Sequence, residues 1–386
     1  MGIRACSKIL LLAAVICAAN LNAGEKPATV YEDQQQGDQL LTLGTPRGKR
    51  FEVKDISWPV APGGAEICLW KDDKVAAVSL TIDDNCKPDH QWWLEQCKKH
   101  NIKVTFFVIG GPVGGKTTSG FSGTWEDWQT LVDTGMVSVQ THTISHKSKD
   151  NERSPEEMDK EYADSQKLMN DHLKNSPCVA LAYPCGNGRF DIAGKYFIAA
   201  RGTYGMPNEA GRIDYINTRA GHMGLHFIDV IVKGSTDKGP KWANDKKFYR
   251  GWFSPLTHLV HYGKNDAERK KAADEYAAMI DYMMQFKDQL WVDTFVDVAK
   301  YGQERDSATL TVTKNTPTEI AITVKDRMRD DIFDLPLTVK VRLPEGMKTP
   351  KATQNGKEVG CRVVSHEGAN FALVDIIPDK GETVIK

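Results

Sequence analysis

The stretch V-A-A-V-S-L-T-I-D-D-N, residues 75–85, decides the fold. Its first eight residues form an almost continuous apolar run, which predicts a strand that is buried on both faces. Residues 89–100 have helical spacing, and residues 104–109, V-T-F-F-V-I, form a second apolar run that ends at two glycines. A strand, a helix and a strand in this order make a βαβ unit, and the two strands of such a unit run parallel.

The same alternation continues along the chain. Ser154, Pro155 and Glu157 form a capping box with proline at the first helical position, which predicts a helix over residues 154–173. Further helices are expected at residues 125–133, 193–200 and 266–286, strands at 136–140, 179–183 and 256–261, and a closing segment at 291–301. Repeated βα units favour a (β/α) barrel or an open doubly wound sheet, and periodicity alone leaves both open.

Two segments flank this α/β domain. Residues 24–66 lack a clear period and are interpreted as an N-terminal arm that wraps the main domain, which is expected to span residues 67–305. Residues 306–386 contain alternating or apolar runs separated by N-T-P, P-E-G and N-G turns. They predict a small all-β, sandwich-like domain.

Composition and the first residues bear on location and partners. The 386 residues carry a formal net charge of -1, so no nucleic-acid partner is expected. Arg4 and Lys8 precede the apolar residues 9–19, and Ala23 is a plausible cleavage point. We interpret residues 1–23 as a signal peptide of a secreted or periplasmic protein, and the poor match of A-V-I-C at Cys17 to a lipobox argues against a lipoprotein anchor. The apolar run is too short to span a membrane, and no later segment qualifies.

Cysteine usage does not indicate a thiolate metal site. Removal of the signal peptide would leave six cysteines, and none of them forms a C-x-x-C pair. An even number permits disulfides in an oxidising compartment, but sequence does not fix the pairing. Buried thiols with at most one bridge are expected.

Two polar motifs follow apolar runs. Asp83 and Asp84 end the first run, and His142 and His146 lie in T-H-T-I-S-H after a later one. Taken alone, the aspartates could cap the next helix and the histidines could be loop residues. Together, one carboxylate and two imidazoles make a three-ligand site suited to Zn²⁺, and the second carboxylate could serve as a base.

These motifs resemble the polysaccharide deacetylase, or NodB-homology, family of metal-dependent carbohydrate deacetylases. T-I-D-D-N resembles the family's T-F-D-D-G, H-T-I-S-H resembles H-[ST]-x-x-H, and A-Y-P-C-G at 182–186 resembles R-x-P-[FY]-G. The last family motif, L-x-H, has two candidates, at residues 256–258 and 259–261. The resemblance covers residues 75–301 and implies a distorted (β/α) barrel.

The resemblance also implies roles for individual residues. Asp83 would be the general base, and the Cys185 backbone N–H would bind the oxyanion. The metal, Zn²⁺ or another first-row ion such as Co²⁺, would be bound by Asp84, His142 and His146. His261 is favoured as the acid that protonates the leaving amine, with His258 as the alternative. Ala182 replaces the family arginine that orients the base, and we propose Arg201 as its substitute.

The expected function is that of a secreted metal-dependent hydrolase that removes N-acetyl groups from an amino-sugar polysaccharide or oligosaccharide. De-O-acetylation by the same site is an alternative, because an ester needs less help from an acid. A catalytically inactive glycan-binding protein is a third possibility. Most tryptophans are expected in the core, and Trp252 is the best candidate to stack on a sugar.

Overall fold

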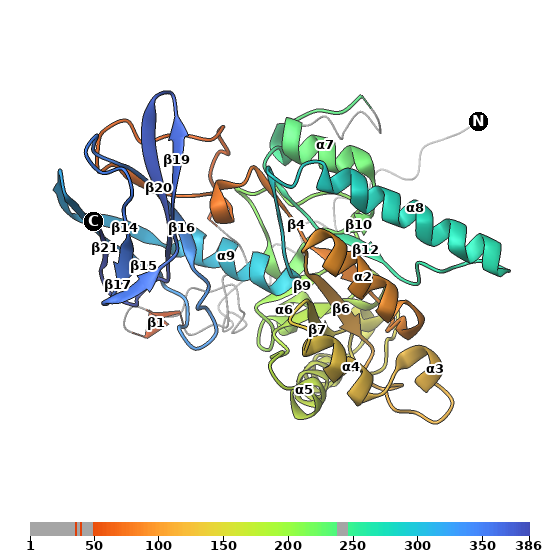
Figure 1. Cartoon of the computed structure of the whole chain (residues 1–386). Coiled ribbons are helices and arrows are strands. Elements are labelled where there is room, and N and C mark those ends of the chain that lie inside the picture. Colours follow the sequence, from red (N-terminus) through yellow and green to blue (C-terminus); the bar gives the residue numbers. More distant parts are fainter. Residues whose placement is uncertain (1–34, 37–38, 41–48, 238–245) are drawn as a thin grey trace, which may run out of the picture.

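The computed structural model describes residues 35–36, 39–40, 49–237 and 246–386, and the predicted signal peptide lies outside these ranges. The chain forms an α/β part and a β-sandwich part, which lie side by side and are joined by helix α9, Phe295–Ser307 (Figure 1). In the described part, no helix is both long enough and apolar enough to cross a membrane.

The α/β part is organised around a sheet of seven parallel strands. Their order is β10-β12-β5-β6-β7-β8-β9, and every pair of neighbours is parallel. The strands are β5 (Leu80–Ile82), β6 (Val104–Val108), β7 (Val137–Thr141), β8 (Ala180–Ala182), β9 (Ala199–Arg201), β10 (Gly221–His222) and β12 (Pro255–Thr257). The parallel sheet predicted from the βαβ units is therefore confirmed.

The sheet curls into a distorted barrel. Thr218, three residues before β10, donates its N–H to Ala200 O of β9 at 2.9 Å and accepts from Gly202 N at 2.9 Å. These bonds link the two edges of the sheet. A second parallel sheet has the strand order β11-β4-β13. Its strands β4 and β11 directly precede β5 and β12 in the chain, and only Ser79 and Ser254 separate them. Its strands are β4 (Ala76–Val78), β11 (Trp252–Phe253) and β13 (Leu290–Val292).

Helices cover the outside of this sheet (Figure 1). The α-helices are α2 (His90–His100), α3 (Ser119–Ser122), α4 (Trp125–Val132), α5 (Pro155–His172), α6 (Phe190–Ala193), α7 (Leu225–Lys233) and α8 (Asp266–Met284), besides α9. Short 3-10 helices are η1 (Lys71–Asp73), η2 (Lys87–Asp89), η3 (Asp150–Glu152), η4 (Pro184–Gly186), η5 (Tyr215–Asn217) and η7 (Lys246–Phe248). The predicted capping box is present, because Ser154 Oγ accepts from Glu157 N at 3.2 Å.

Two helix predictions differ from the structure. A helix over residues 193–200 was wrong, because α6 ends at Ala193 and residues 199–201 form the buried strand β9. Gly194 follows α6 directly, and glycine weakens a helix interior. Helix α7 was not among the helices expected from the sequence. Six of its nine residues are buried, so it lacks the polar face that reveals a surface helix.

The C-terminal part consists of two antiparallel sheets with a shared apolar core. One sheet contains β14 (Thr309–Thr316), β15 (Glu319–Lys325), β21 (Thr383–Ile385), β17 (Ala352–Gln354) and β18 (Lys357–Val359). The other contains β19 (Cys361–His366), β20 (Ala369–Ile376), β16 (Leu337–Arg342) and β3 (Ala65–Ile67). Strand β3 precedes the barrel in sequence yet pairs with β16. The three residues of this strand were too few to indicate the pairing from the sequence. Strands β1 (Gln35–Gln36) and β2 (Gln39–Leu40) pair antiparallel with each other.

The core is continuous from the barrel into the sandwich. One apolar cluster joins Trp252 and Phe295 of the α/β part to Ile320 and Val339 of the sandwich. Trp252 is fully buried and donates its indole N–H to Ser79 Oγ at 3.1 Å. Its proposed role in stacking on a sugar is therefore wrong, because the ring has no free face. All six cysteines in the described residues are free thiols.

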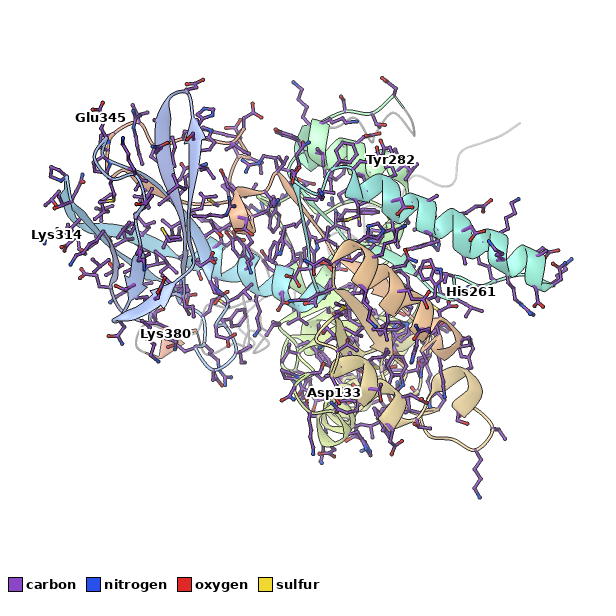
Figure 2. The ribbon with its side chains drawn as sticks, viewed as in Figure 1. Asp133, His261, Tyr282, Lys314, Glu345 and Lys380 are labelled. Atoms are coloured by element: carbon purple, nitrogen blue, oxygen red, sulfur yellow. The ribbon has the colours of Figure 1, made fainter. Side chains whose placement is uncertain are left out.

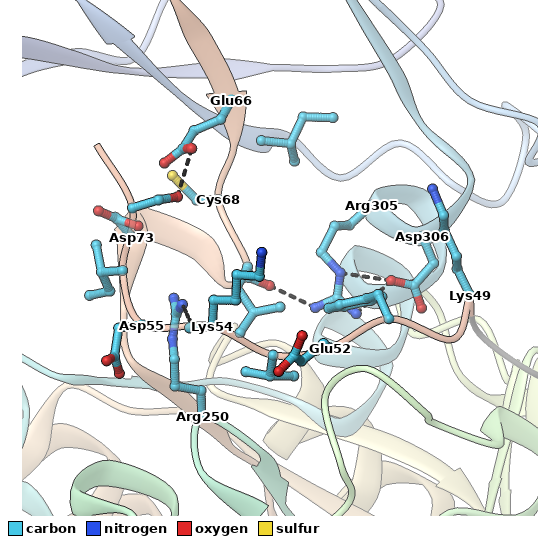
Figure 3. A pocket seen from close by; sticks show the side chains of 16 residues that line it. Lys49, Glu52, Lys54, Asp55, Glu66, Cys68, Asp73, Arg250, Arg305 and Asp306 are labelled. Carbon is cyan, nitrogen blue, oxygen red and sulfur yellow. Dashed lines mark hydrogen bonds and ion pairs between the residues drawn. The ribbon is translucent and has the colours of Figure 1, made fainter. Parts of the chain in front are cut away.

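A cavity of about 320 Å³ lies between the arm, β3 and α9 (Figure 3). Its two arginines are already bound by the chain: Arg250 donates to Lys54 O at 2.8 Å, and Arg305 pairs with Asp306 at 2.6 Å. None of the residues predicted to form the catalytic site lines it. The cavity belongs to the attachment of the arm and does not contain the predicted chemistry.

Candidate active site

The predicted site residues meet at the carboxyl edge of the barrel sheet. Asp83 follows β5, His142 follows β7, Arg201 ends β9 and His258 follows β12. Because these strands are parallel members of one sheet, their carboxyl ends lie on one side of it. The fold therefore brings together residues that are far apart in the sequence.

Asp84, His142 and His146 form a compact group of ligand atoms. Asp84 Oδ1 lies 3.5 Å from His142 Nε2 and 3.3 Å from His146 Nε2. The ligand atoms all lie within 4.8 Å of one another, and this is the one such group of three among the described residues. Asp84 Oδ1 is buried and accepts no well-directed hydrogen bond. A carboxylate oxygen and two ring nitrogens that converge in this way fit a divalent cation.

The backbone fixes the orientation of His142. Its Nδ1 lies 2.7 Å from Ala182 O, and a carbonyl only accepts, so the ring proton is placed on Nδ1. Nε2 is then left with its lone pair directed toward Asp84. Burial lowers the pKa of His142, which keeps the ring neutral as a metal ligand requires. Thus Ala182, which stands where the resembling family has arginine, helps to orient His142 through its backbone carbonyl.

The other two ligands influence each other's charge. Burial raises the pKa of Asp84, but His146 together with the nearby His142 and His258 outweighs it, and the net pKa is lowered. The pKa of His146 is raised, chiefly by its contact with Asp84. Asp84 is consequently ionised and holds His146 against it. A cation bound here would replace the proton of His146.

A left-handed turn begins at Asp84, directly after Asp83. Asp84, Asn85 and Cys86 have φ of 60°, 67° and 45°, a conformation that costs about 1–2 kcal/mol for most residues and less for asparagine. Asn85 offsets this cost by exchanging two hydrogen bonds with Ile109, at 2.8 Å and 3.1 Å. The turn changes the direction of the chain after Asp83, so that its side chain and that of Asp84 serve different partners.

Glu161 of α5 holds the loop between the two histidines. Its Oε1 accepts from Ile144 N at 3.0 Å, and from the Ser145 N–H and hydroxyl at 2.8 Å each. Burial raises the pKa of Glu161, but the hydrogen bonds from Ser145 and Ile144 outweigh it and leave the pKa lowered. The sequence did not identify this residue, because Glu161 is an ordinary polar position in an amphipathic helix.

Glu161→Gln should weaken metal binding without removing a ligand. Loss of the charged acceptor frees the loop before His146, and outer partners of metal ligands typically contribute about 10–100-fold to affinity. Metal affinity can be measured by competition with a chromogenic chelator. Glu156→Gln, on the exposed side of the same helix, is the matched control and should bind metal as the wild type does. Equal affinities for the two variants would contradict this role.

Asp83 is paired with Arg201. Arg201 Nη2 lies 2.5 Å from both carboxylate oxygens of Asp83, and its Nη1 donates to Gly202 O at 3.1 Å. Arg201 is fully buried and its guanidinium lies over the ring of Phe107. The structure therefore places the arginine where our sequence interpretation expected a substitute for the missing family arginine.

The late histidines lie in different places from those expected. His258 Nε2 lies 3.6 Å from Asp84 Oδ2, whereas His261 Nδ1 lies 2.6 Å from Asp89 Oδ1, beside α2 (Figure 2). The preference for His261 assumed a strand over residues 256–261, and this strand ends early. Strand β12 ends at Thr257, since its partner β5 ends at Ile82. His258, not His261, is thus at the strand end next to the ligand group.

Asp89 is a supporting residue that sequence reasoning took for the start of a helix. It is fully buried and accepts from Val260 N at 2.5 Å in addition to its contact with His261. These two bonds hold the loop that begins at His258. Only the fold reveals this contact, because 171 residues separate Asp89 from Val260.

Cys185 lies three residues after Ala182 and has a left-handed φ of 53° within η4. Its side chain is exposed. This places its backbone close in sequence to the carbonyl that orients His142. Its role as an oxyanion donor stays a prediction.

The arrangement combines a buried, arginine-bound carboxylate, a group of three ligand atoms, and an imidazole on the other side of Asp84. Asp83 Oδ2 lies 4.0 Å from His142 Nε2, so the carboxylate borders the ligand group without being one of its three members. A carboxylate in this position can accept a proton from a water, and an imidazole can donate one. The chemistry that these groups support is hydrolysis.

Comparisons with known proteins agree with this site. Residues 71–196 match the family Polysaccharide deacetylase. Gellan lyase from a Bacillus species is 35% identical over 371 residues, which are 91% of this chain and 14% of that protein. YxkH of Bacillus subtilis (strain 168), whose name assigns it to the polysaccharide deacetylases, is 30% identical over 175 residues, 42% of this chain and 58% of YxkH. The chain thus spans less than two thirds of both relatives.

Among solved structures, the Streptococcus pyogenes deacetylase PplD, in complex with acetate, overlaps with 36% of this chain and 62% of its own, at 23% identity and a TM-score of 0.33. The sequence match is the stronger finding, since residues 71–196 contain the D-D and H-x-x-x-H motifs and the ligand group that they form. Residues 71–196 of this chain therefore match the polysaccharide deacetylase (NodB-homology) family.

Proposed function

We propose that this chain is a metal-dependent hydrolase that removes N-acetyl groups from an amino-sugar polysaccharide. The observation that carries the proposal is the pairing of buried Asp83 with Arg201 beside the ligand group of Asp84, His142 and His146. The family match supports deacetylation, and the name of the relative that acts on gellan favours a polysaccharide over a small glycoside.

The side chains divide the work. Asp83 is the base that accepts a proton from the attacking water, and Arg201 holds its carboxylate in place. Asp84, His142 and His146 would hold the cation, for which we propose Zn²⁺, with Co²⁺ as an alternative. When bound, the cation supplies positive charge that polarises the acetyl carbonyl and lowers the pKa of the water. The Cys185 N–H is proposed to donate to the oxyanion.

An amide adds one requirement that an ester largely lacks. An amine leaves poorly unless it is protonated, so a proton donor is needed on the leaving-group side. His258 fulfils this requirement, since it lies 3.6 Å from Asp84 Oδ2 and about half of its side chain is exposed to solvent and substrate. This placement favours an N-acetyl substrate over an O-acetyl one.

A pair of histidine variants tests this division. His258→Ala should lower acetate release from N-acetylglucosamine oligomers about a hundredfold, and from an O-acetylated xylan much less. His261→Ala is the matched control, because it removes an imidazole that contacts Asp89 and not the ligand group. It should have the smaller effect on both substrates. The measurement is kcat for each substrate. Equal losses on amide and ester would contradict the assignment of His258 as the acid.

We further propose that the chain acts outside the cytoplasm. The proposal is based on the charged, apolar and small-residue order of residues 1–23, which resembles a secretory signal. Fractionation of cells that express the full chain tests it: the mature protein should appear in the medium or periplasm with its first residues removed. Retention of the full-length chain in the cytosol would contradict it.

A further inference from the structure

Three exposed aromatic side chains border the candidate site. Phe121, Tyr204 and Tyr262 are 44%, 52% and 64% exposed, and in the described part of the chain they are the exposed members of the Phe, Tyr and Trp residues. They lie in the connections that follow β6, β9 and β12, with Phe121 in the short helix α3 of the first connection. All three are therefore on the carboxyl side of the barrel sheet, where Asp83 and the ligand group lie.

Phe121 is attached to the loop that carries the aspartates. Its neighbour Ser122 accepts from Asn85 Nδ2 at 3.4 Å and from the Trp128 indole N–H at 3.0 Å. Asn85 follows Asp84 directly. The backbone at Phe121 is thus held next to the metal-ligand loop, and its ring projects into solvent from there.

Tyr204 lies over the backbone beside Arg201. A Cβ added to Gly202 would come within 3.0 Å of Tyr204 Cε2, so the ring packs against this glycine, whose missing side chain leaves room for it. Gly202 O in turn accepts from Arg201 Nη1 at 3.1 Å. The ring therefore borders the arginine that holds Asp83.

Tyr262 lies on the loop that follows β12, the loop that also carries His258. It follows His261, which contacts Asp89 at 2.6 Å, and it lies four residues after His258 on the same loop. This loop is held by Asp89 through Val260 N as well. The exposed ring is consequently carried by a loop whose backbone is fixed close to the proposed acid.

We infer that Phe121, Tyr204 and Tyr262 form a rim that binds a polysaccharide chain across the site through ring stacking, an inference that rests on the proposed function. Exposing aromatic rings has a hydrophobic cost, and Trp93, Trp128 and Trp252 of the barrel avoid it by burial. Three exposed rings on separate connections around one proposed hydrolytic site are explained by a ligand that covers them. A pyranose chain presents apolar C–H faces at successive units, and rings on different sides of the site can hold units on both sides of the one that reacts.

A rim of three separate rings fits a substrate that is an extended chain. A single sugar at the ligand group could contact at most a neighbouring ring, whereas an oligomer could reach all three. The rings should therefore contribute to KM for long substrates and leave the chemical step on a short one unchanged. A protein that docked on these rings would instead cover Asp83 and His258, and would inhibit hydrolysis.

The test compares N-acetylglucosamine oligomers from the monomer to the hexamer. Phe121→Ala, Tyr204→Ala and Tyr262→Ala should each raise KM for the hexamer about two- to tenfold, with kcat unchanged and with little effect on the monomer. Phe121→Tyr, Tyr204→Phe and Tyr262→Phe keep the rings and should behave as the wild type does. The variants replace exposed side chains, so they should fold, which circular dichroism checks.

Two results would overturn the inference. The first is an unchanged KM for the hexamer in the variant that lacks all three rings. The second is an equal loss on monomer and hexamer, which would show that the rings only support the catalytic loops. Hexamer binding measured by calorimetry separates this inference from the proposed function. A wild type that binds hexamer through the rings but releases no acetate contradicts the function alone, and normal acetate release without ring-dependent binding contradicts the rim alone.

Discussion

Asp83→Asn should reduce acetate release by about 10³–10⁴-fold, because a positioned general base contributes up to this order and an amide cannot accept the proton. The substitution preserves the size of the side chain and leaves the ligand group of Asp84, His142 and His146 intact. Metal content and polysaccharide binding should therefore remain. The measurement is single-turnover acetate release, with metal content determined on the same sample.

The control for this variant is Asp288→Asn. Asp288 is an exposed aspartate that lies before β13, outside the candidate site, and its replacement should change neither turnover nor metal content. If Asp83→Asn released acetate at the rate of the control, Asp83 would not be the base. If it lost its metal as well, Asp83 would belong to the ligand set.

Arg201→Ala should destabilise the fold and reduce turnover together. Arg201 is fully buried, and its Nη2 lies 2.5 Å from both oxygens of Asp83, which is itself only 4% exposed. Removal of one partner of a buried pair leaves an uncompensated charge and typically costs about 3–5 kcal/mol. Urea unfolding gives the free energy of unfolding, and acetate release gives the loss of kcat.

A double variant separates the charge from the packing. If the cost of Arg201→Ala comes from the unpaired carboxylate, then Asp83→Asn in the same chain should recover part of the lost free energy of unfolding, because the asparagine is neutral. Arg201→Lys keeps the positive charge but lacks the planar fork, so it should be intermediate in both measurements. Wild-type stability and turnover in Arg201→Ala would contradict the role of this arginine.

The sequence was informative where a local pattern has one structural meaning. Apolar runs predicted the strands β5 and β6, and the alternation with helices predicted a parallel sheet, which the structure confirms. The D-D and H-x-x-x-H motifs were expected to meet because both follow strands of one sheet, and Asp84 and His146 lie 3.3 Å apart. Arg201 was proposed as the substitute for the missing family arginine, and the structure shows it in contact with Asp83.

The sequence was less informative where the outcome depends on contacts between distant segments. His258 and His261 both end an L-x-H triplet, and the choice between them depends on where β5 stops pairing with β12. Asp89 and Glu161 hold the loops that carry site residues, but no local pattern distinguishes them from capping or surface carboxylates. Strand β3 is too short to show a period, and only its pairing with β16 defines it.

The most direct test of a metal-dependent deacetylation site is acetate release before and after removal of metal. The mature chain is stripped with a chelator, assayed on N-acetylglucosamine hexamer, and then resupplied with Zn²⁺ or Co²⁺. We expect release to stop on stripping and to return with metal in the wild type, but not in His146→Ala, which removes one of the three ligands. Undiminished release by the metal-free protein, or metal-restored release in His146→Ala equal to that of the wild type, would contradict the site described for Asp84, His142 and His146.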